Sequence, residues 1–296
     1  MSNDDSLLAY LNGEFLPRGE ARLPITDRGL LFGDSVYEVV PAYGGRPFRV
    51  SHHLQRLDRS LAAIRMHNPL SHEEWRVVFD RLARQLPAED QSIYLQVTRG
   101  AYPKRNHVIP TEIKPNVLAF TSPNPPRDTE KAQRGIRVIT LDDIRWHRCD
   151  IKATTLLANV LARAQASEEG ADEAILMRDG TAMEGTASNL FVVSHGLLIT
   201  PPDSDELLPG ITRDLVLELA SDAGIPFAQA AIGTVDLDSA DEIWLTSSTR
   251  EVAAVVELNG HPVGNGQPGE LWYRMDALFQ ACKERLRLGV ECHDNY

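Results

Sequence analysis

The sequence predicts a protein of mixed α and β structure, α/β or α+β, that is built from two domains. Its 296 residues fit one large or two medium domains. Hydrophobic residues make up 43% and charged residues 24%, which is the composition of a folded globular protein. Strand-like runs and amphipathic segments occur on both sides of a proline-rich stretch at 122–128. We therefore predict domains at 1–122 and 134–296, joined by a linker at 123–133.

The first domain is expected to contain hairpins, two helices and two further strands. An Asn-Gly pair at 12–13 and a Gly-Gly pair at 44–45 each separate two apolar runs, which is typical of β-hairpins. Ser51 and Ser71 are suited to cap helices, because apolar residues follow them at spacings of three and four. The expected strands are 7–11, 14–16, 36–43, 47–50, 92–98 and 116–121, and the two helices begin at Ser51 and Ser71.

The second domain is expected to mix strands with helices and to end on a helix. Three short apolar runs follow one another between 173 and 200, with glycine turns between them. Gly224 and Pro226 form a stop signal for the helix that precedes them. The expected strands are 136–141, 173–177, 189–193, 197–200 and 243–245, and the expected helices are 154–167, 212–223 and 271–286.

The charge balance argues against two classes of partner. Lysine and arginine total 30 against 42 aspartates and glutamates, so the net charge is −12. A field of that sign repels nucleic-acid backbones and anionic lipid surfaces. We therefore expect neither nucleic-acid nor membrane binding, although a local basic pocket for a small anion is compatible with the net charge.

Neither the N-terminus nor the cysteines indicate export. No basic segment followed by an apolar core is visible after Met1, and no apolar run approaches the ~20 residues of a membrane helix. Cys149, Cys282 and Cys292 are too few and too scattered for a disulfide framework or a zinc site, although two of them could pair. We expect a cytoplasmic protein without a metal centre.

Two segments of the second domain are suited to bind an anion. Residues 208–214 place Gly210 and a hydroxyl at the start of a helix, where free N–H groups and the positive end of the helix dipole converge. Residues 245–251 follow a strand with four consecutive hydroxyl residues. Either segment alone is typical of an ordinary helix cap. Two of them in one domain favour a phosphate ligand.

A lysine and a carboxylate could supply the chemistry that accompanies such a ligand. Lys152 follows a cluster of basic and aromatic residues at 143–151 and directly precedes the small-residue start of a predicted helix. Most lysines are simply solvated, but a desolvated one near other cations is a competent imine-forming amine. Glu184 lies at a glycine turn that enters an apolar strand. A lysine, a carboxylate and a phosphate site are what a pyridoxal phosphate enzyme must supply.

The sequence resembles the fold-type IV (class IV) pyridoxal phosphate aminotransferases, and among them most resembles the D-amino-acid transaminases. The matching segments keep their order over nearly the whole chain, from about residue 10 to residue 260. It departs from that pattern in a slightly longer stretch at 101–104 and in a less serine-rich turn at 186–187. The matching segments are 27–29, 32–40, 53–57, 96–100, 143–152, 184–189, 210–214 and 246–249.

The resemblance implies a small N-terminal α/β domain, a larger C-terminal β-barrel-like domain with helices, and pyridoxal 5′-phosphate as the cofactor. Lys152 matches the Schiff-base lysine, and Glu184 matches the carboxylate that keeps the pyridine nitrogen protonated. A homodimer with its active site near the subunit interface is implied as well. The residues that match the phosphate site are Arg56, Ile211, Thr212, Ser247 and Ser248, and those that match the substrate carboxylate site are Tyr37, Arg105 and His107.

The implied reaction is transamination between a D-amino acid, of the D-alanine or D-glutamate type, and a 2-oxo acid, and three other functions remain open. Branched-chain L-amino-acid transaminases share the cofactor residues but hold the substrate carboxylate differently, and the triplet at 105–107 favours the D-specific pocket. An aminodeoxychorismate lyase has the same fold, but the segment 143–152 is more like that of a transaminase. A non-catalytic binding protein is disfavoured by Lys152 and Glu184.

Overall fold

The computed structural model describes residues 6–290, 292 and 293. Its helices and strands form two compact units, and each unit is assembled from separate stretches of the chain. The chain first crosses from one unit to the other between Pro126 and Arg127, inside the predicted linker at 123–133. The first unit comprises the chain up to Pro126, Ile151–Thr155 and the residues from Arg285 onward, and the second unit comprises Arg127–Asp150 and Leu156–Glu284.

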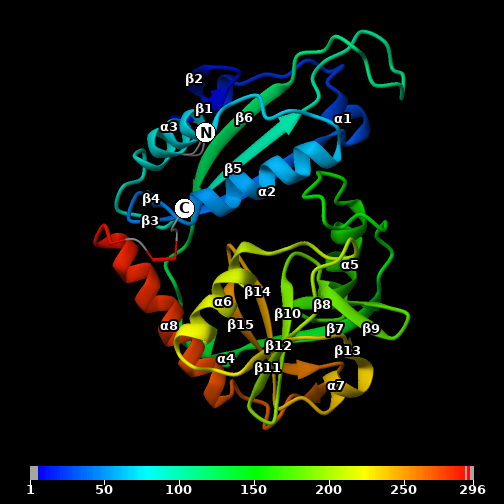
Figure 1. Cartoon of the computed structure of the whole chain (residues 1–296), viewed down its shortest axis with the longest axis vertical. Helices are drawn as coiled ribbons and strands as arrows, with labels where there is room; N and C mark the ends of the chain where they lie inside the picture. Colours follow the sequence, from blue (N-terminus) through cyan, green and yellow to red (C-terminus); the bar gives the residue numbers. More distant parts are fainter. Residues whose placement is uncertain (1–5, 291, 294–296) are drawn as a thin grey trace. The chain divides into compact units, whose positions relative to one another are not determined.

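A six-stranded antiparallel sheet in the order β2-β1-β6-β5-β3-β4 is the frame of the first unit (Figure 1). The Asn-Gly pair at 12–13 connects β1 to β2, and the Gly-Gly pair at 44–45 connects β3 to β4. All four turn residues have positive φ, so both predicted hairpins are confirmed. The strands are β1 (Leu8–Leu11), β2 (Glu14–Pro17), β3 (Ser35–Tyr43), β4 (Arg46–Pro47), β5 (Gln91–Thr98) and β6 (Asn116–Pro123).

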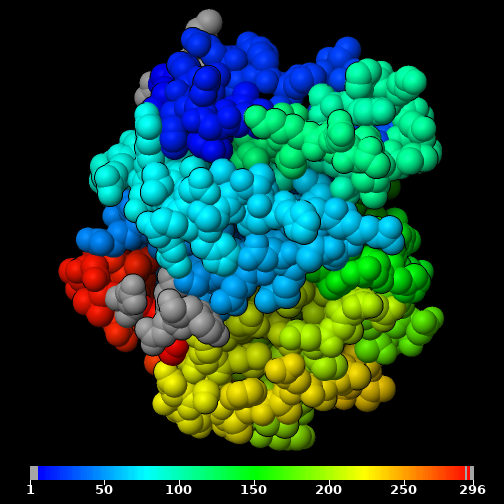
Figure 2. Space-filling view, turned by 45° about the horizontal axis from the view of Figure 1, so that its top comes forward, coloured from blue at the N-terminus to red at the C-terminus, as the bar shows by residue number. Residues whose placement is uncertain are grey.

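Two amphipathic helices, α2 (Val50–Ala63) and α3 (His72–Ala83), pack their apolar faces against this sheet. Leu54, Leu57 and Leu61 of α2 are buried in the same core cluster as the inward side chains of β3 and β5. The opposite faces of α2 and α3 are half-buried to exposed and form the light-blue and cyan surface in Figure 2. This sheet and its helices hold Tyr37 and Glu38, which lie near the start of β3. Two short helices complete the unit, η2 (Arg18–Glu20) and α1 (Arg28–Phe32).

The starts of α2 and α3 differ in how well the local sequence predicts them. Ser71 caps α3 in a capping box, in which Glu74 N donates to Ser71 Oγ (3.2 Å) and Ser71 N donates to the Glu74 carboxylate (2.7 Å). The predicted cap at Ser51 is wrong, because Arg49 occupies the N-cap position of α2 in a left-handed conformation. Ser51 lies inside the helix, and its hydroxyl accepts a hydrogen bond from Arg76.

A ten-stranded mixed sheet forms the second unit and curls as a half-barrel (Figure 1). Nine strands follow the order β12-β11-β10-β14-β15-β7-β8-β9-β13, and β16 pairs with β15. The pairs β15–β7, β7–β8 and β11–β12 are parallel, and the other pairs are antiparallel. The strands are β7 (Ile136–Asp142), β8 (Glu173–Arg178), β9 (Thr181–Gly185), β10 (Asn189–Ser194), β11 (Leu197–Thr200), β12 (Phe227–Gln229), β13 (Ile232–Gly233), β14 (Glu242–Ser247), β15 (Glu251–Leu258) and β16 (His261–Pro262).

The three helices predicted for the second domain are present in the structure, but the predicted start of the first of them is wrong. The helix expected from residue 154 begins only at Leu157. The preceding segment is extended, because Ala153 forms an isolated bridge with Val36 of β3. The mixed α and β fold class is confirmed, whereas β9, β12, β13, β15, β16 and the helices of six residues or fewer were not predicted. The helices are α4 (Thr129–Arg134), α5 (Leu157–Glu168), α6 (Ile211–Asp222), α7 (Thr234–Asp238) and α8 (Glu270–Arg287).

The three cysteines are not all in the same state. Cys282 and Cys292 are each disulfide-bonded, and Cys149 is a buried free thiol.

Among the helices of the described residues, none combines the length and the apolar character needed to cross a membrane.

Candidate active site

Lys152 is attached to the first unit through its backbone. Tyr37 N of β3 donates to Lys152 O (3.0 Å), and Lys152 N donates to Ser60 Oγ of α2 (3.2 Å). The lysine therefore lies in an extended segment beside β3, and the expectation that it stands at the start of a helix is wrong. Both of these bonds use backbone atoms of Lys152, so they position the residue without engaging its side-chain amine.

The side chain of Lys152 lies against an aromatic pair. Its Nζ is 4.4 Å from the centroid of the Tyr37 ring, which is a cation–π distance. The Tyr37 ring stacks on Tyr94 of β5 at 5.7 Å. Burial raises the pKa of Tyr94 to about 12, so this tyrosine stays neutral at physiological pH. The structure thus brings together two of the residues singled out in the sequence, Lys152 and Tyr37.

Arg56, a predicted phosphate ligand, lies in a buried cluster with Glu38 and His53. Arg56 Nε and Nη2 donate to the two oxygens of Glu38 (both 2.7 Å), and the Nδ1 atom of His53 lies 2.8 Å from the same carboxylate. Burial alone would raise the pKa of Glu38, but Arg56 and His53 hold that pKa well below its usual range. Glu38 therefore stays ionised, and its carboxylate fixes the position of Arg56. The sequence analysis did not identify this role of Glu38, although a carboxylate inside an otherwise mostly apolar strand is the feature that could have indicated it.

Arg105 and His107, the other two predicted substrate residues, lie around Phe32. The Arg105 guanidinium is 5.2 Å from the centroid of the Phe32 ring, and the His107 ring meets the same ring edge-to-face at 5.2 Å. Both side chains are exposed. The three predicted substrate residues are thus divided between two clusters, with Tyr37 beside Lys152.

A buried arginine holds the loop that carries these two residues. Arg28 donates to the backbone carbonyls of Asn106 (2.6 Å) and His107 (3.4 Å). Its Nε donates to Asp34 (2.8 Å), which also accepts from Arg99 Nε (2.7 Å). Burial would raise the pKa of Asp34, but the two arginines lower it, so the network stays charged. Sequence reasoning did not identify Arg28 as a support for this loop, because the contact spans about 80 residues.

Glu184 is the centre of the cluster in the second unit. Its carboxylate is 5% exposed and accepts hydrogen bonds from Asn189 Nδ2 (3.1 Å) and Leu208 N (3.1 Å), and it forms a close ion pair with Arg145. Burial raises the pKa of Glu184, and Arg145 opposes that rise. The carboxylate is therefore immobilised by three donors from three different segments.

Arg145 is itself shared between two carboxylates. Its Nε and Nη2 donate to the two oxygens of Asp143 (2.8 and 2.9 Å), and Arg178 donates to the same aspartate (2.8 Å). Glu206 accepts from Arg178 Nη1 (2.8 Å) and thereby extends the network. Arg145 belongs to the basic and aromatic segment at 143–151, whose composition is the only local feature that points to it. Its contact with Glu184, 39 positions away, cannot be predicted from that segment.

Asn189 joins Glu184 to both predicted anion segments. Its Nδ2 also donates to Leu208 O (2.8 Å), and it lies opposite Thr246 in the β10–β14 register. A side chain at Gly210, the N-cap of α6, would lie 1.8 Å from Asn189 Oδ1, so a glycine is required there. The structure therefore brings Glu184 close to the N-terminus of α6, which carries the predicted Ile211 and Thr212, and to the end of β14, which carries the predicted Ser247 and Ser248.

The unused polar groups of this cluster fit an anionic ligand. The hydroxyl oxygens of Ser188 and Thr246 are buried and have no hydrogen-bond partner within the described part of the chain. Unsatisfied buried hydroxyls cost free energy unless a ligand or water pairs with them. Helix α6 adds free N–H groups at its first turn. Together with a fixed carboxylate, this donor set suits a phosphorylated ring that also carries a protonatable nitrogen.

The family follows from a match that covers most of the chain. The model for "Amino-transferase class IV" matches residues 35–258. The chain belongs to the class IV aminotransferases. The matched range includes Lys152, Glu184 and the two anion segments.

Two groups of known class IV aminotransferases illustrate the similarity. The D-alanine aminotransferases of Bacillus licheniformis and Staphylococcus haemolyticus are each 39% identical to the chain, with alignments that cover 91% of it and 94% and 95% of those proteins. The structure of a branched-chain amino acid aminotransferase from T.th. with pyridoxamine 5′-phosphate superposes with a TM-score of 0.90 at 27% identity and covers 98% of this chain and 99% of that one. The Escherichia coli branched-chain enzyme gives a TM-score of 0.84 at 25% identity and covers 97% and 96%.

Proposed function

We propose that this class IV aminotransferase uses pyridoxal 5′-phosphate to transfer the amino group of a D-amino acid, such as D-alanine or D-glutamate, to a 2-oxo acid. The observation that best supports pyridoxal phosphate as the cofactor is the fixed Glu184 carboxylate between two hydroxyl-bearing segments. The D-preference is supported by relatives named D-alanine aminotransferase, which are 37–39% identical over more than nine-tenths of the chain. The branched-chain enzymes that share the fold are 25–28% identical.

When bound, pyridoxal phosphate supplies an aldehyde carbon for the amine and a ring that takes up the charge of the deprotonated Cα. Glu184 would accept a hydrogen bond at the pyridine nitrogen and hold a proton there, and the three donors around it keep it in place. The residues proposed to hold the phosphate are Arg56, Ile211, Thr212, Ser247 and Ser248.

Lys152 would carry the cofactor and move the proton. Its amine is not engaged by the two bonds that fix its backbone, so it can take the Cα proton as a base and return it as an acid. The Tyr37 ring beside it limits the directions that the amine can take. Replacement of Lys152 by alanine should lower turnover by several orders of magnitude, because the amine is needed for both tasks.

Arg105, His107 and Tyr37 would bind the substrate carboxylate. A guanidinium is a planar two-pronged donor that matches a carboxylate, so Arg105 would provide most of the binding. With the carboxylate bound by Arg105, a D-amino acid would present its Cα hydrogen to Lys152, whereas an L-amino acid would present its side chain there. This arrangement is the proposed origin of the stereochemical preference.

A panel of substrates tests the reaction. We expect the enzyme loaded with pyridoxal phosphate to convert D-alanine and 2-oxoglutarate to pyruvate and glutamate faster than it uses L-leucine, and to release no pyruvate from aminodeoxychorismate. A preference for L-leucine would establish the branched-chain alternative. Borohydride treatment followed by peptide mass analysis should place the cofactor on the peptide that contains Lys152 and should fail in Lys152→Ala.

We also propose a cytoplasmic homodimer in which Arg105 and His107 serve the partner's site, in keeping with their exposure in the single chain. Light scattering should give twice the chain mass of 32.9 kDa. Mixed dimers of Lys152→Ala and Arg105→Ala provide a sharper test. If Arg105 acts across the interface, one of the two sites in a mixed dimer is intact, and activity returns on mixing. Activity that stays at the level of the separate variants would place Arg105 and Lys152 of one chain in the same site.

A further inference from the structure

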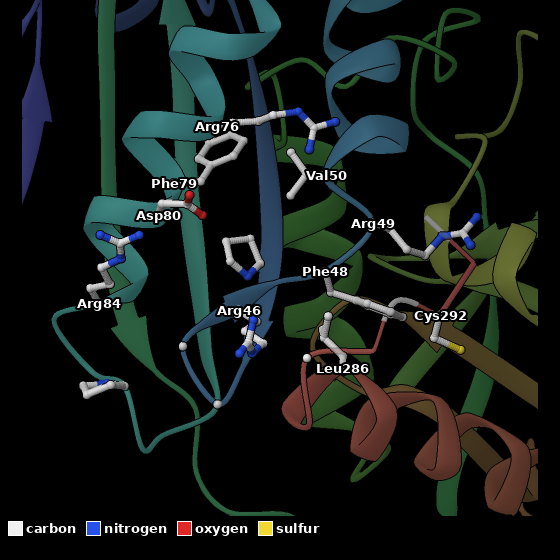
Figure 3. Close-up of a pocket in the computed structure, with 15 residues that line it drawn as sticks. Arg46, Phe48, Arg49, Val50, Arg76, Phe79, Asp80, Arg84, Leu286 and Cys292 are labelled. Atoms are coloured by element: carbon white, nitrogen blue, oxygen red, sulfur yellow. The ribbon is translucent and has the colours of Figure 1, made fainter. Parts of the chain in front are cut away.

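The first unit contains a cavity of about 570 Å³ that the proposed reaction does not use. It lies between the β3–β4 turn, α3 and the residues that follow α8, and all of its lining residues belong to the first unit (Figure 3). Its volume is in the range of small-molecule sites, which is ~300–1,000 Å³. None of the residues proposed for the cofactor or the substrate lines it.

The lining is strongly basic, in contrast to the chain as a whole. Arg46, Arg49, Arg76 and Arg84 line the cavity, and Asp80 is the only acidic residue among its described lining residues. Guanidinium groups stay charged at any physiological pH. In a chain with a net charge of −12, four arginines around one cavity create a local positive field that favours a multiply charged anion.

Two of these arginines are held in place by the protein. Arg49 is 1% exposed, and its Nη1 donates to His293 O (2.6 Å). Arg76 Nη2 donates to Ser51 Oγ in the first turn of α2 (2.6 Å). The N-terminus of α2 lies at the same place, since Val50 lines the cavity, and its dipole adds to the positive potential.

The other two arginines are exposed at the cavity and have no carboxylate partner among the described residues. Arg84 lies at the C-terminal end of α3 and Arg46 in β4, so they come from different elements (Figure 3). The Arg46 guanidinium lies against Gly289, where an added Cβ would be 3.1 Å from Nη2. The backbone therefore makes room for this side chain, and its donors remain available to a ligand.

Apart from Asp80 and the glycines, the remaining lining is apolar, which indicates a ligand other than a simple inorganic ion. Phe48, Val50 and Phe79 are buried core residues, and Leu286 is half-buried. In Figure 3 these side chains lie among the arginines rather than in a separate region. A ligand that fills the cavity would combine anionic groups with a flat or apolar part.

We propose that this cavity binds a phosphorylated ring compound of the nucleotide class. Its phosphates would pair with Arg46, Arg76 and Arg84, whose planar donors suit phosphate oxygens, and its ring would contact the apolar lining. The amino acids and 2-oxo acids of the proposed transamination carry no phosphate, and none of the residues proposed to bind them lines the cavity, so this site is separate from that reaction and does not depend on it.

Calorimetric titration of the cofactor-loaded full chain with ATP tests the proposal, because the loaded enzyme already has its own phosphate site occupied. Adenosine, inorganic phosphate and 2-oxoglutarate serve as comparison ligands. The test variant is Arg46→Ala/Arg84→Ala, in which both changed residues are exposed. The matched control is Arg22→Ala/Arg59→Ala, which removes two exposed arginines of the same unit outside the cavity.

We expect one ATP per chain, an affinity that falls with added salt, and a Kd at least about tenfold higher in the test variant. The control variant should bind ATP like the wild type, and the three comparison ligands should bind more weakly. Absence of saturable binding overturns the proposal, as does an unchanged Kd in the test variant or an equal loss in the control. Phosphate or 2-oxoglutarate binding as tightly as ATP would overturn the assignment to a ring compound.

Discussion

Each of the two units contains a glutamate buried against an arginine, yet the pKa values of these two residues, Glu38 and Glu184, are shifted in opposite directions. In the first unit, the pKa of Glu38 lies well below its usual range, and in the second unit burial raises the pKa of Glu184. Both carboxylates are almost completely buried, with exposures of 0% and 5%. Burial and the type of partner therefore do not explain the difference.

The difference lies in how each arginine is shared. Arg56 directs two donors at Glu38, and His53 adds a third polar contact. Arg145 directs its two-pronged face at Asp143 and only Nη1 at Glu184, and the charge of Asp143 further raises the pKa of Glu184. The Glu38 carboxylate is thus fully paired and fixes Arg56 in place. The other pair leaves a carboxylate that is fixed in place but incompletely neutralised, which suits the stabilisation of a ligand cation.

Replacement of Glu38 by glutamine should have the largest effect in this comparison, and the effect should be on stability. It leaves Arg56 charged and buried without its counter-ion, so the free energy of unfolding should fall by about 3–5 kcal/mol. Urea unfolding of Glu38→Gln measures the loss. Glu14→Gln, an exposed change on β2, is the control and should stay within about 0.5 kcal/mol of the wild type. A loss no larger than that of the control would show that the pair is not a structural one.

Replacement of Glu184 by glutamine should act on turnover more than on folding. An amide cannot stabilise a protonated pyridine nitrogen, so kcat should fall by about 10²–10³-fold while the cofactor stays bound. Steady-state kinetics together with the absorbance of the bound cofactor separate these two effects. The exposed Glu168→Gln of α5 serves as the control. An unchanged kcat would reduce Glu184 to a residue of the turn.

Arg105 differs from Arg56 and Arg145, because no carboxylate of the described residues pairs with it. If it is reserved for the substrate carboxylate, Arg105→Ala should lose about 2–4 kcal/mol in kcat/KM for D-alanine, and the ratio of D- to L-alanine activity should shrink. Lys104→Ala removes a neighbouring exposed cation and should leave both quantities unchanged. Full D-preference in Arg105→Ala would exclude this residue as the stereochemical anchor.

The pH dependence of stability should show the smallest but most direct contrast between the two pairs. A lowered pKa in the folded state means that Glu38 stabilises above the usual glutamate pKa of 4.5, and that this contribution is lost as the pH falls below it. A raised pKa has the opposite effect. The free energy of unfolding falls as the pH rises from 4.5 through the raised pKa of Glu184, because the buried carboxylate must then ionise. Each slope is at most about 1.4 kcal/mol per pH unit.

Urea unfolding of wild type, Glu38→Gln and Glu184→Gln over a range of pH values measures both slopes. The stability advantage of wild type over Glu38→Gln should grow from acid to neutral pH, and that over Glu184→Gln should diminish. Two slopes of the same sign would contradict the assigned difference between the pairs.

The sequence by itself determined the features that depend on neighbouring residues. The Asn-Gly turn at 12–13 and the capping box of Ser71 with Glu74 form through contacts within a few residues, and the structure has both. The apolar faces of α2 and α3 follow from helical spacing in the same way. Lys152 and Glu184 could be singled out because their residue types and local settings suit a specific chemistry.

Tertiary structure alone decided which of these residues meet. The extended segment at 151–155 pairs with β3 instead of starting a helix, because a backbone bridge to Val36 outweighs the local helical preference. Arg28 contacts Asn106 and Arg145 contacts Glu184 across 78 and 39 positions of the sequence, so each pairing depends on segments that only the fold brings together. The opposite pKa shifts of Glu38 and Glu184 also depend on tertiary structure. A pKa in a protein interior depends on every charge within a few ångströms, whatever the position of that charge along the chain.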